Sequence, residues 1–325
     1  MRSAAILARL KGPFQRQGVL RSLLFRALLP APFPLTLSIE PTNRCNLECV
    51  SCPRQERPQG NLELALFARL IAESTAHGRR LMLTLHKDGE PTLHPRLDEL
   101  VAMAKRADAA RLVTFNSNGT ALTRELAGRL VLAGLDEIIV SVDASNGGSY
   151  QQLKGKQLFE VVCANVDGMM RVKKELGREN PFVKVQILGT LHQLADSVPE
   201  FLRAWQGRVD GVKVDRFTTW GGGVDGRLGA VVVPERRWPC QYLWYTMAVN
   251  WDGRVSRCVY DWRVDEPVGD AGRESLAAIW NGPRFAALRA AHLAGEYPGI
   301  CAACSNWAET DNMGRFLGTI GTAWA

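Results

Sequence analysis

The chain has 325 residues, of which 46% are hydrophobic and 22% charged, and its formal net charge is +7. This length suits one barrel-sized domain, alone or with a small appendage. The basic residues are scattered rather than massed, which argues against a nucleic-acid-binding face. No segment has about 18 uninterrupted apolar residues, so no membrane span is expected.

Residues 1–34 form a basic, amphipathic N-terminal segment in which Val19–Leu29 has helical spacing and ends at Pro30. A helix on a membrane surface and a helix packed on the following domain both fit this pattern, and we favour the second. Arg9 and Lys11 interrupt the apolar run, and no small-residue cleavage site follows. We therefore predict a cytoplasmic protein, where clustered cysteines are more often metal ligands or catalysts than disulfides.

From residue 35 onward, short apolar runs alternate with helical patterns. Six segments are predicted as strands: Leu35–Glu40, Arg80–His86, Ala110–Gly119 (with a turn), Glu137–Ala144, Phe182–Thr190 and Gly211–Trp220. Five segments are predicted as helices: Glu63–Thr75, Arg96–Ala107, Arg124–Gly134, Leu158–Leu176 and roughly Val198–Gln206. This alternation indicates parallel strands with crossover helices, in an open partial barrel or a doubly wound sheet. In either fold, ligands bind at the carboxyl ends of the strands.

A different pattern begins at Gly221–Gly229, which reads as a linker. Beyond it, Tyr245–Tyr260 alternates apolar residues around Asp252-Gly253, a strong hairpin signal, and Ser275–Gly295 is predicted as a helix. We expect a separate small unit held together by something other than its own core. The predicted division of the chain is therefore 1–34, 35–229 and 230–325.

Three cysteines, Cys45, Cys49 and Cys52, lie within eight residues after the first predicted strand, with neither a fourth cysteine nor a histidine beside them. A structural zinc site is closed by four ligands. Three thiolates leave one position open, either on a zinc ion that also binds water or on the fourth iron of a [4Fe–4S] cube. Spacing alone does not distinguish these two sites.

The neighbouring loops add a family resemblance. Cys45-x3-Cys49-x2-Cys52 is similar to the cluster motif of the radical S-adenosylmethionine (SAM) superfamily. Lys87–Pro95, after the second strand, resembles the family's Gly-Gly-Glu-Pro turn, with Asp88 in place of the first glycine. The resemblance implies an α/β fold with a partial (β/α)6 TIM-type barrel, and a [4Fe–4S] cluster whose open iron binds SAM.

Two later loops extend the resemblance: Asn116–Gly119 is similar to a Thr-Asn-Gly turn, and Ser141–Ala144 to a Ser-hydrophobic-Asp strand end. The aromatic or methionine residue that usually packs on adenine is replaced by Ser51, so the fifth strand is expected to contact adenine instead. The SAM contacts that the resemblance implies are Gly89, Glu90, Asn118, Ser141, Ile187 and Leu188. In this family, one electron from the cluster cleaves SAM to a 5′-deoxyadenosyl radical, which removes a hydrogen atom from the substrate.

A second cysteine set brackets the predicted hairpin: Cys240, Cys258, Cys301 and Cys304. By spacing alone it could form a zinc ribbon. The surrounding sequence resembles the SPASM/twitch extension of radical SAM enzymes, and its four cysteines suggest the shorter twitch form with one auxiliary [4Fe–4S] cluster. Four thiolates leave no open iron, which suits electron transfer better than substrate binding.

The expected activity is that of a radical SAM oxidoreductase. It would take hydrogen from a sugar-like or aminocyclitol small molecule, and the auxiliary cluster would accept the second electron, as in twitch dehydrogenases of antibiotic biosynthesis. The alternatives are a radical SAM epimerase of a sugar or oligosaccharide, a peptide-modifying maturase, and a non-catalytic double zinc-binding module. An epimerase commonly needs a cysteine thiol, and the spare Cys163 has the helical spacing of a packed, structural residue.

Substrate and partner predictions complete this interpretation. Residues 1–34 are too short for a leader-binding domain, which favours a small substrate. Arg216 and Tyr260 are the predicted catalytic residues, and Lys154 and Trp220 are further substrate-contact candidates. The histidines His86 and His94 beside the SAM turn are expected to be structural. The expected electron donor is a reducing protein such as flavodoxin or ferredoxin.

Overall fold

The structure is a computed structural model that describes residues 32–53, 56–77, 81–189, 197–228, 235 and 237–308. The predicted helix at Val19–Leu29 lies outside these residues, so its role stays a prediction. Within the described ranges, no helix is both long and apolar enough to cross a bilayer.

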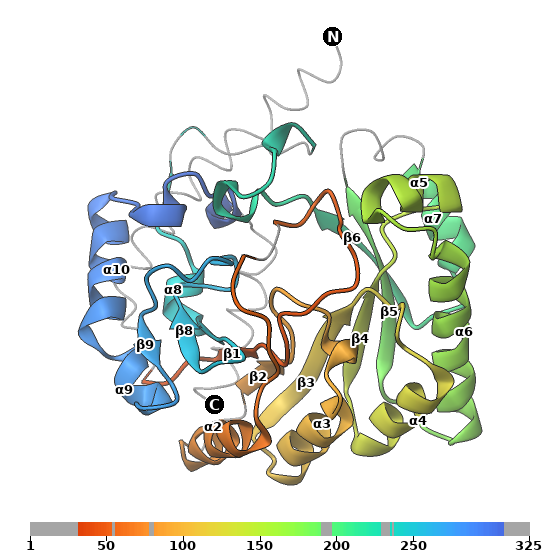
Figure 1. Cartoon of the computed structure of the whole chain (residues 1–325), viewed down its shortest axis with the longest axis horizontal. Helices are drawn as coiled ribbons and strands as arrows, with labels where there is room; N and C mark the ends of the chain where they lie inside the picture. Colours follow the sequence, from red (N-terminus) through yellow and green to blue (C-terminus); the bar gives the residue numbers. More distant parts are fainter. Residues whose placement is uncertain are drawn as a thin grey trace.

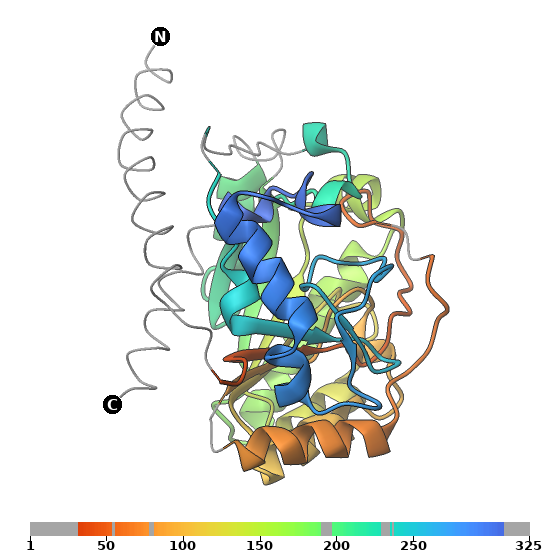
Figure 2. The ribbon, with the colours of Figure 1, turned by 90° about the vertical axis from the view of Figure 1, so that its left-hand side faces the viewer.

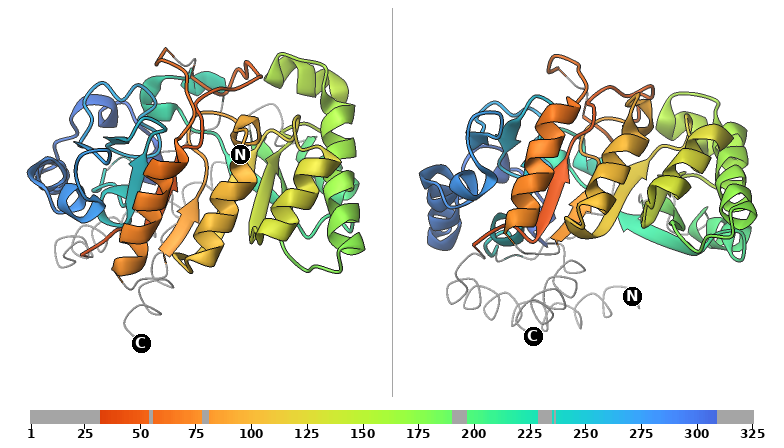
Figure 3. Two further views of the ribbon diagram at one scale, coloured as in Figure 1. Left: turned by 60° about the horizontal axis from the view of Figure 1, so that its bottom comes forward. Right: turned by 90° about the horizontal axis from the view of Figure 1, so that it is seen from below.

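The six predicted parallel strands form one sheet in the order β6-β5-β4-β3-β2-β1, which confirms the partial barrel (Figure 1). The strands are β1 (Thr36–Ile39), β2 (Leu81–Thr84), β3 (Ala110–Ser117), β4 (Glu137–Ser141), β5 (Phe182–Gly189) and β6 (Gly211–Arg216). The crossover helices are α2 (Leu64–Ala76), α3 (Leu97–Arg106), α4 (Arg124–Ala133), α6 (Phe159–Glu175) and α7 (Ser197–Trp205). Figure 3 shows α2, α3, α4 and α6 side by side on the outer face of the sheet.

Alternation along the strands separates the two faces of this sheet. On β5, Val183, Val185 and Ile187 are fully buried in the hydrophobic core, on the side covered by the helices. The alternate residues, including Gln186 and Leu188, therefore face the barrel interior. The polar and ionisable groups of the interior are thus separated from the apolar core by the thickness of the sheet.

The C-terminal part extends the same sheet, and the expectation of a separate unit needs correction. Strand β7 (Thr246–Val249) pairs in parallel with β1, and the antiparallel strands β8 (Arg254–Ser256) and β9 (Gly269–Asp270) follow, confirming the hairpin. Trp280 and Phe285 are fully buried in the core that also contains Leu37 of β1. Figure 2 shows this blue part of the chain packed beside the barrel strands.

Two helical predictions also change. The segment predicted as one helix over Ser275–Gly295 consists of α9 (Leu276–Trp280) and α10 (Pro283–Ala294), because Pro283 has no N–H to continue a helix and instead begins one. Helix α5 (Gly147–Lys154) was not predicted. It begins where the Asn146 side chain accepts a hydrogen bond from the Ser149 N–H.

Candidate functional site

The three-cysteine loop leaves the carboxyl end of β1 and is closed at its base. The Thr42 hydroxyl donates to the Gly60 carbonyl at 2.7 Å, and the Asn43 amide donates to the Pro58 carbonyl at 2.9 Å. At its tip, the Val50 N–H donates to the Leu153 carbonyl of α5 at 3.0 Å. The loop is therefore held by hydrogen bonds at its base and at its tip.

The thiols of this loop influence one another. A hydrogen bond with Cys52 lowers the pKa of Cys49 to about 7, and the same bond together with burial raises the pKa of Cys52. Burial raises the pKa of Cys45. Cys45 also lies 3.9 Å from the Asn118 amide nitrogen, which connects it to the turn after β3. The three thiols thus share one small region at the carboxyl edge of the sheet.

The turn after β2 packs directly against the backbone of this loop. A Cβ atom on Gly89 would lie 2.2 Å from the Thr42 carbonyl oxygen and 2.7 Å from Asn43 backbone atoms. The next residue, Glu90, donates its N–H to the Arg44 carbonyl at 2.8 Å. Only glycine permits this approach of two backbones, because any side chain would occupy the space that the Thr42 carbonyl fills.

The buried Glu90 carboxylate organises the turn after β3. It accepts hydrogen bonds from the Ser117 hydroxyl at 2.7 Å and the Asn118 N–H at 2.6 Å, and a further pair from Thr92. Burial raises the pKa of Glu90. The Asn118 amide in turn donates to Asn46 at 2.9 Å. Three predicted site segments are therefore joined in one hydrogen-bond network beside the cysteine loop.

The second cysteine set lines a cavity in the SPASM region, which we call the auxiliary cavity. Its lining includes all four of these residues: Cys240, Cys258, Cys301 and Cys304. Burial and the neighbouring thiols raise the pKa of Cys258, and they raise that of Cys301 to about 11. Thiols that raise one another's pKa in this way are close together and gain from a metal that replaces their protons.

Positive side chains surround the auxiliary cavity. Arg237 donates to the Cys301 carbonyl at 2.6 Å and lies over the Tyr297 ring at 3.8 Å. Arg257 is 8% exposed and donates to the Pro298 carbonyl at 3.4 Å. Arg257 also forms an ion pair with Glu266, so the half-buried Arg237 is the cation that would favour a negatively charged occupant.

Comparison with known families agrees with this geometry. A family model described as the Radical SAM superfamily matches residues 39–204, about half of the chain. The chain belongs to the radical SAM superfamily. A second model, described as the SPASM iron-sulfur cluster-binding domain, matches residues 240–305. The predicted superfamily and extension are thereby confirmed.

Among relatives of this radical SAM protein is the tungsten-containing aldehyde ferredoxin oxidoreductase cofactor-modifying protein of Pyrococcus furiosus. It is 28% identical over 169 residues, or 51% of this chain and 47% of the relative. A GTP 3′,8-cyclase of Chlorobaculum tepidum is 33% identical over 132 residues, or 40% of this chain and 39% of the relative. The chain thus matches less than half the length of these curated relatives.

Two solved structures share the fold. BtrN in complex with AdoMet and 2-DOIA superposes with a TM-score of 0.59 and 19% identity, covering 85% of this chain and 94% of BtrN. SuiB of Streptococcus suis, bound to the precursor peptide SuiA, gives a TM-score of 0.63 and 13% identity, covering 90% of this chain and 74% of SuiB. At these identities the likeness concerns the fold alone.

The donor sets fit the cofactors of the superfamily. A radical SAM protein uses SAM and a [4Fe–4S] cluster, and a SPASM region implies auxiliary iron-sulfur clusters. Within the described ranges, no three His, Cys, Asp or Glu side chains converge as they would around one metal ion. A cubane cluster instead takes each thiolate on a separate iron, and both cysteine sets consist of thiols alone.

Four buried charges join the cysteine loop, the SAM turn and the SPASM region. Arg57 lies 3.0 Å from Glu40 and 2.8 Å from Asp88, which also pairs with Lys87. Arg57 and Lys87 donate to the backbone carbonyls of Trp262 and Asp261, respectively.

Asp88 replaces the first glycine of the family turn, and its place in this network was not predicted. Burial raises the pKa of Asp88 to about 6. Its partner Arg57 comes from an irregular loop, so the sequence offers no spacing that would pair the two residues.

The predicted adenine contacts lie on different faces of β5. Leu188 pairs with Asp215 of β6 and faces the barrel interior, whereas Ile187 pairs with Val214 on the helix-facing side and is fully buried in the core. Ser141 ends β4 and pairs with Gln186, on the interior face. The geometry therefore favours Leu188 over Ile187 for a ligand in the barrel.

The same register bears on the predicted catalytic Arg216. Val212 and Val214, which share the period-two alternation of Arg216 on β6, pair with Val185 and Ile187, the β5 residues on the helix-facing side. Arg216 ends β6 at the carboxyl edge, and its side chain lies outside what the structure describes.

The aromatic and lysine candidates are placed more clearly. Tyr260 lies edge-on to Trp220 at 5.5 Å and to Tyr242 at 5.6 Å, and it lines the auxiliary cavity. Lys154 is buried and forms an ion pair with Asp143 at 2.5 Å, beside the cysteine loop. The structure therefore gives Lys154 a structural partner in place of the predicted substrate contact.

Polar residues inside the barrel were missed by the sequence interpretation. Lys213 of β6 lies 2.8 Å from Asp215 and 3.4 Å from Gln186 of β5. Burial and the Lys213 charge lower the pKa of His86 to about 4, which places these two side chains on the same interior surface. The alternation of Lys213 and Asp215 with valines was the available signal.

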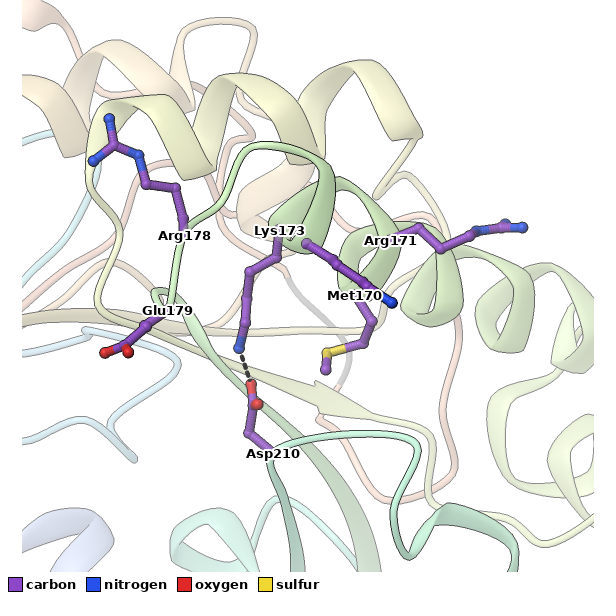
Figure 4. Close-up of a pocket in the computed structure, with 7 residues that line it drawn as sticks. Met170, Arg171, Lys173, Arg178, Glu179 and Asp210 are labelled. Carbon is purple, nitrogen blue, oxygen red and sulfur yellow. Dashed lines mark hydrogen bonds and ion pairs between the residues drawn. The ribbon is translucent and has the colours of Figure 1, made fainter.

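A separate pocket of about 540 Å³ lies at the amino-terminal edge of the sheet (Figure 4). Its residues precede β5 and β6, so it is at the end of the barrel opposite to the cysteine loop. Its central charges, Lys173 and Asp210, are paired at 2.5 Å. This pocket therefore contributes nothing to the cluster sites.

The Gly89 contact generates the first prediction. Replacement of Gly89 by alanine forces the SAM turn away from the Thr42 carbonyl, so we expect SAM affinity to fall at least tenfold while the iron content is unchanged. Equilibrium dialysis of anaerobically reconstituted protein with labelled SAM measures this. Gly168→Ala in α6 is the control, because a Cβ atom added there would meet no other atom within 4 Å. Unchanged affinity in Gly89→Ala would contradict the role of the turn.

The auxiliary cavity generates the second prediction. We expect about eight irons per reconstituted chain, about four in Cys258→Ala, and about eight in Cys163→Ala, because Cys163 lies on α6 away from both cysteine sets. Colorimetric iron and sulfide analysis provides the measurement. Equal iron loss in the two variants, or stoichiometric zinc in place of iron, would be incompatible with a four-cysteine cluster.

Proposed function

We propose that this radical SAM protein dehydrogenates a small polar molecule, either sugar-like or an aminocyclitol. The observation that carries the proposal is the auxiliary cavity, which all four SPASM cysteines line. When bound, SAM and the clusters supply the radical that removes a hydrogen atom from a carbinol or amine-bearing carbon and, once a proton has left, the acceptor for the remaining electron. The substrate thus loses two electrons and two protons and becomes a ketone or imine.

The chain's own contribution begins with SAM. We assign the methionine end of SAM to the turn formed by Gly89 and Glu90, where the Glu90 carboxylate keeps the Asn118 backbone in position at 2.6 Å. Ser141 is assigned to the ribose and Leu188 to adenine, since both lie on the interior face of the sheet. These contacts orient SAM over the cysteine loop.

The substrate is assigned to the barrel interior between the two cysteine sets. Lys213, Asp215 and Gln186 offer a cation, an anion and an amide on one surface, with the neutral ring of His86 across from them. Such a mixture suits hydroxyl and amino groups, which both donate and accept hydrogen bonds. An apolar substrate would form no hydrogen bond with these groups.

Two predicted residues keep a place in this proposal. Tyr260 lies beside the auxiliary cavity, between Trp220 and Tyr242, where its ring can face a substrate near that cluster. Arg216 stays a prediction, supported by its position at the carboxyl end of β6. The electron donor is proposed to be a reducing protein such as flavodoxin or ferredoxin.

The comparisons support a small substrate without deciding it. BtrN was crystallised with AdoMet and 2-DOIA, and this chain covers 94% of its length. SuiB was crystallised with a precursor peptide, so a peptide is the competing substrate class. Epimerisation has less support, because Cys163 is packed on α6 and burial raises the pKa of its thiol to about 11.

Product analysis tests the proposal. Reconstituted protein is incubated with SAM, dithionite and a panel of aminocyclitols, sugars and short peptides in deuterated water, and products are identified by mass spectrometry. We expect a carbonyl or imine product from a member of the small-molecule panel, two mass units lighter than its substrate. Deuterium at a retained C–H carbon would instead indicate epimerisation, and a modified peptide would indicate a maturase.

A matched variant separates the two clusters in this reaction. Cys258→Ala removes the proposed electron acceptor, so we expect 5′-deoxyadenosine to form while the oxidised product is lost. Cys163→Ala should retain both products. Full substrate oxidation in Cys258→Ala would overturn the assigned role of the auxiliary cluster.

A further inference from the structure

His292 of α10 is a buried histidine with one unused nitrogen beside the auxiliary cavity. The side chain is 1% exposed, and its ring lines the cavity together with the four SPASM cysteines. Its Nδ1 accepts a hydrogen bond from the Cys240 N–H at 3.1 Å. Its Nε2 is buried and has no hydrogen-bond partner among the residues that the structure describes.

The hydrogen bond fixes the state of this ring. Because Nδ1 accepts a hydrogen bond from the Cys240 N–H, it carries no proton, so the ring is neutral and its one proton is assigned to Nε2. His292 therefore presents an N–H donor, and a buried donor without an acceptor destabilises a protein.

The surroundings hold the ring against the cavity. Tyr297 contacts it edge-on at 5.0 Å, and the same tyrosine ring lies under Arg237 at 3.8 Å. Arg237 is itself bound to the Cys301 carbonyl at 2.6 Å. The ring is thus held between the segments that carry Cys240 and Cys301, on opposite sides of the cavity. When a cluster occupies the cavity, its sulfur atoms supply hydrogen-bond acceptors beside this ring.

We propose that His292 donates a hydrogen bond from Nε2 to a sulfur of the auxiliary cluster and thereby raises its reduction potential. Reduction adds negative charge to the cluster, and an N–H donor stabilises that charge. His292 is a positioning residue that acts through the cluster and does not touch the substrate. This role requires the SPASM cluster alone and holds whichever substrate the protein uses.

Three variants test this proposal in the full-length, reconstituted protein. His292→Asn keeps an oxygen near the Nδ1 position for the Cys240 N–H but has no donor near Nε2. His292→Gln places an amide N–H near Nε2, and His292→Phe removes both. We expect the reduction equilibrium of the auxiliary cluster to shift about tenfold against reduction in the Asn and Phe variants, or about 59 mV for a one-electron couple. The Gln variant should recover part of this shift.

Redox titration followed by electron paramagnetic resonance measures the potential, with iron content checked for each variant. His94→Asn is the control, because His94 is also buried but lies beside the SAM turn. An unchanged potential in His292→Asn with full iron content would overturn the proposal.

A second measurement keeps the test decisive if the variants lose their cluster. Wild-type protein carrying histidine labelled with ¹⁵N in the ring should show a ¹⁵N coupling to the reduced auxiliary cluster. The same coupling should persist in labelled His94→Asn. Its absence from the wild type would overturn the proposal, and neither result depends on substrate oxidation.

Discussion

The structure depends on four buried charges, Glu40, Arg57, Lys87 and Asp88, that neutralise one another where the cysteine loop meets the SAM turn. Removing one member would leave an uncompensated buried charge, at a cost of about 3–5 kcal/mol. The same group holds the SPASM region, because Arg57 donates to the Trp262 carbonyl at 2.8 Å. One electrostatic cluster therefore fixes the relative positions of three segments that are distant in sequence.

The same constraint fixes the two cysteine sets relative to each other, as the proposed reaction requires. The pairing of β7 with β1 makes the SPASM hairpin a continuation of the barrel sheet. The auxiliary cavity is therefore held in a fixed position relative to the cysteine loop. Electron transfer between a substrate and a cluster requires such a fixed separation. In our proposals the polar surface around Lys213 receives the substrate, and His292 donates an N–H to the auxiliary cluster.

The sequence alone predicted those features of the fold and the site that depend on neighbouring residues. The cysteine spacings, the glycine at position 89 and the alternation of strands and helices predicted the barrel and its loops. It failed where distant segments meet: no pattern pairs β7 with β1, and nothing in an irregular loop marks Arg57 as the partner of Asp88. On β6, the charged Lys213 and Asp215 alternate with Val212 and Val214, and the pairing of Asp215 with Leu188 puts the charged residues on the interior face. The sequence interpretation did not predict this face.

The central claim is our proposal that the three cysteines of the first loop would hold a [4Fe–4S] cluster with one iron open to SAM. Its most direct test is formation of 5′-deoxyadenosine from SAM by dithionite-reduced, anaerobically reconstituted protein, quantified by chromatography. We expect formation by the wild type and none by alanine variants of Cys45, Cys49 or Cys52. Equal amounts from the wild type and these variants, or none from any of them, would show that no such iron exists.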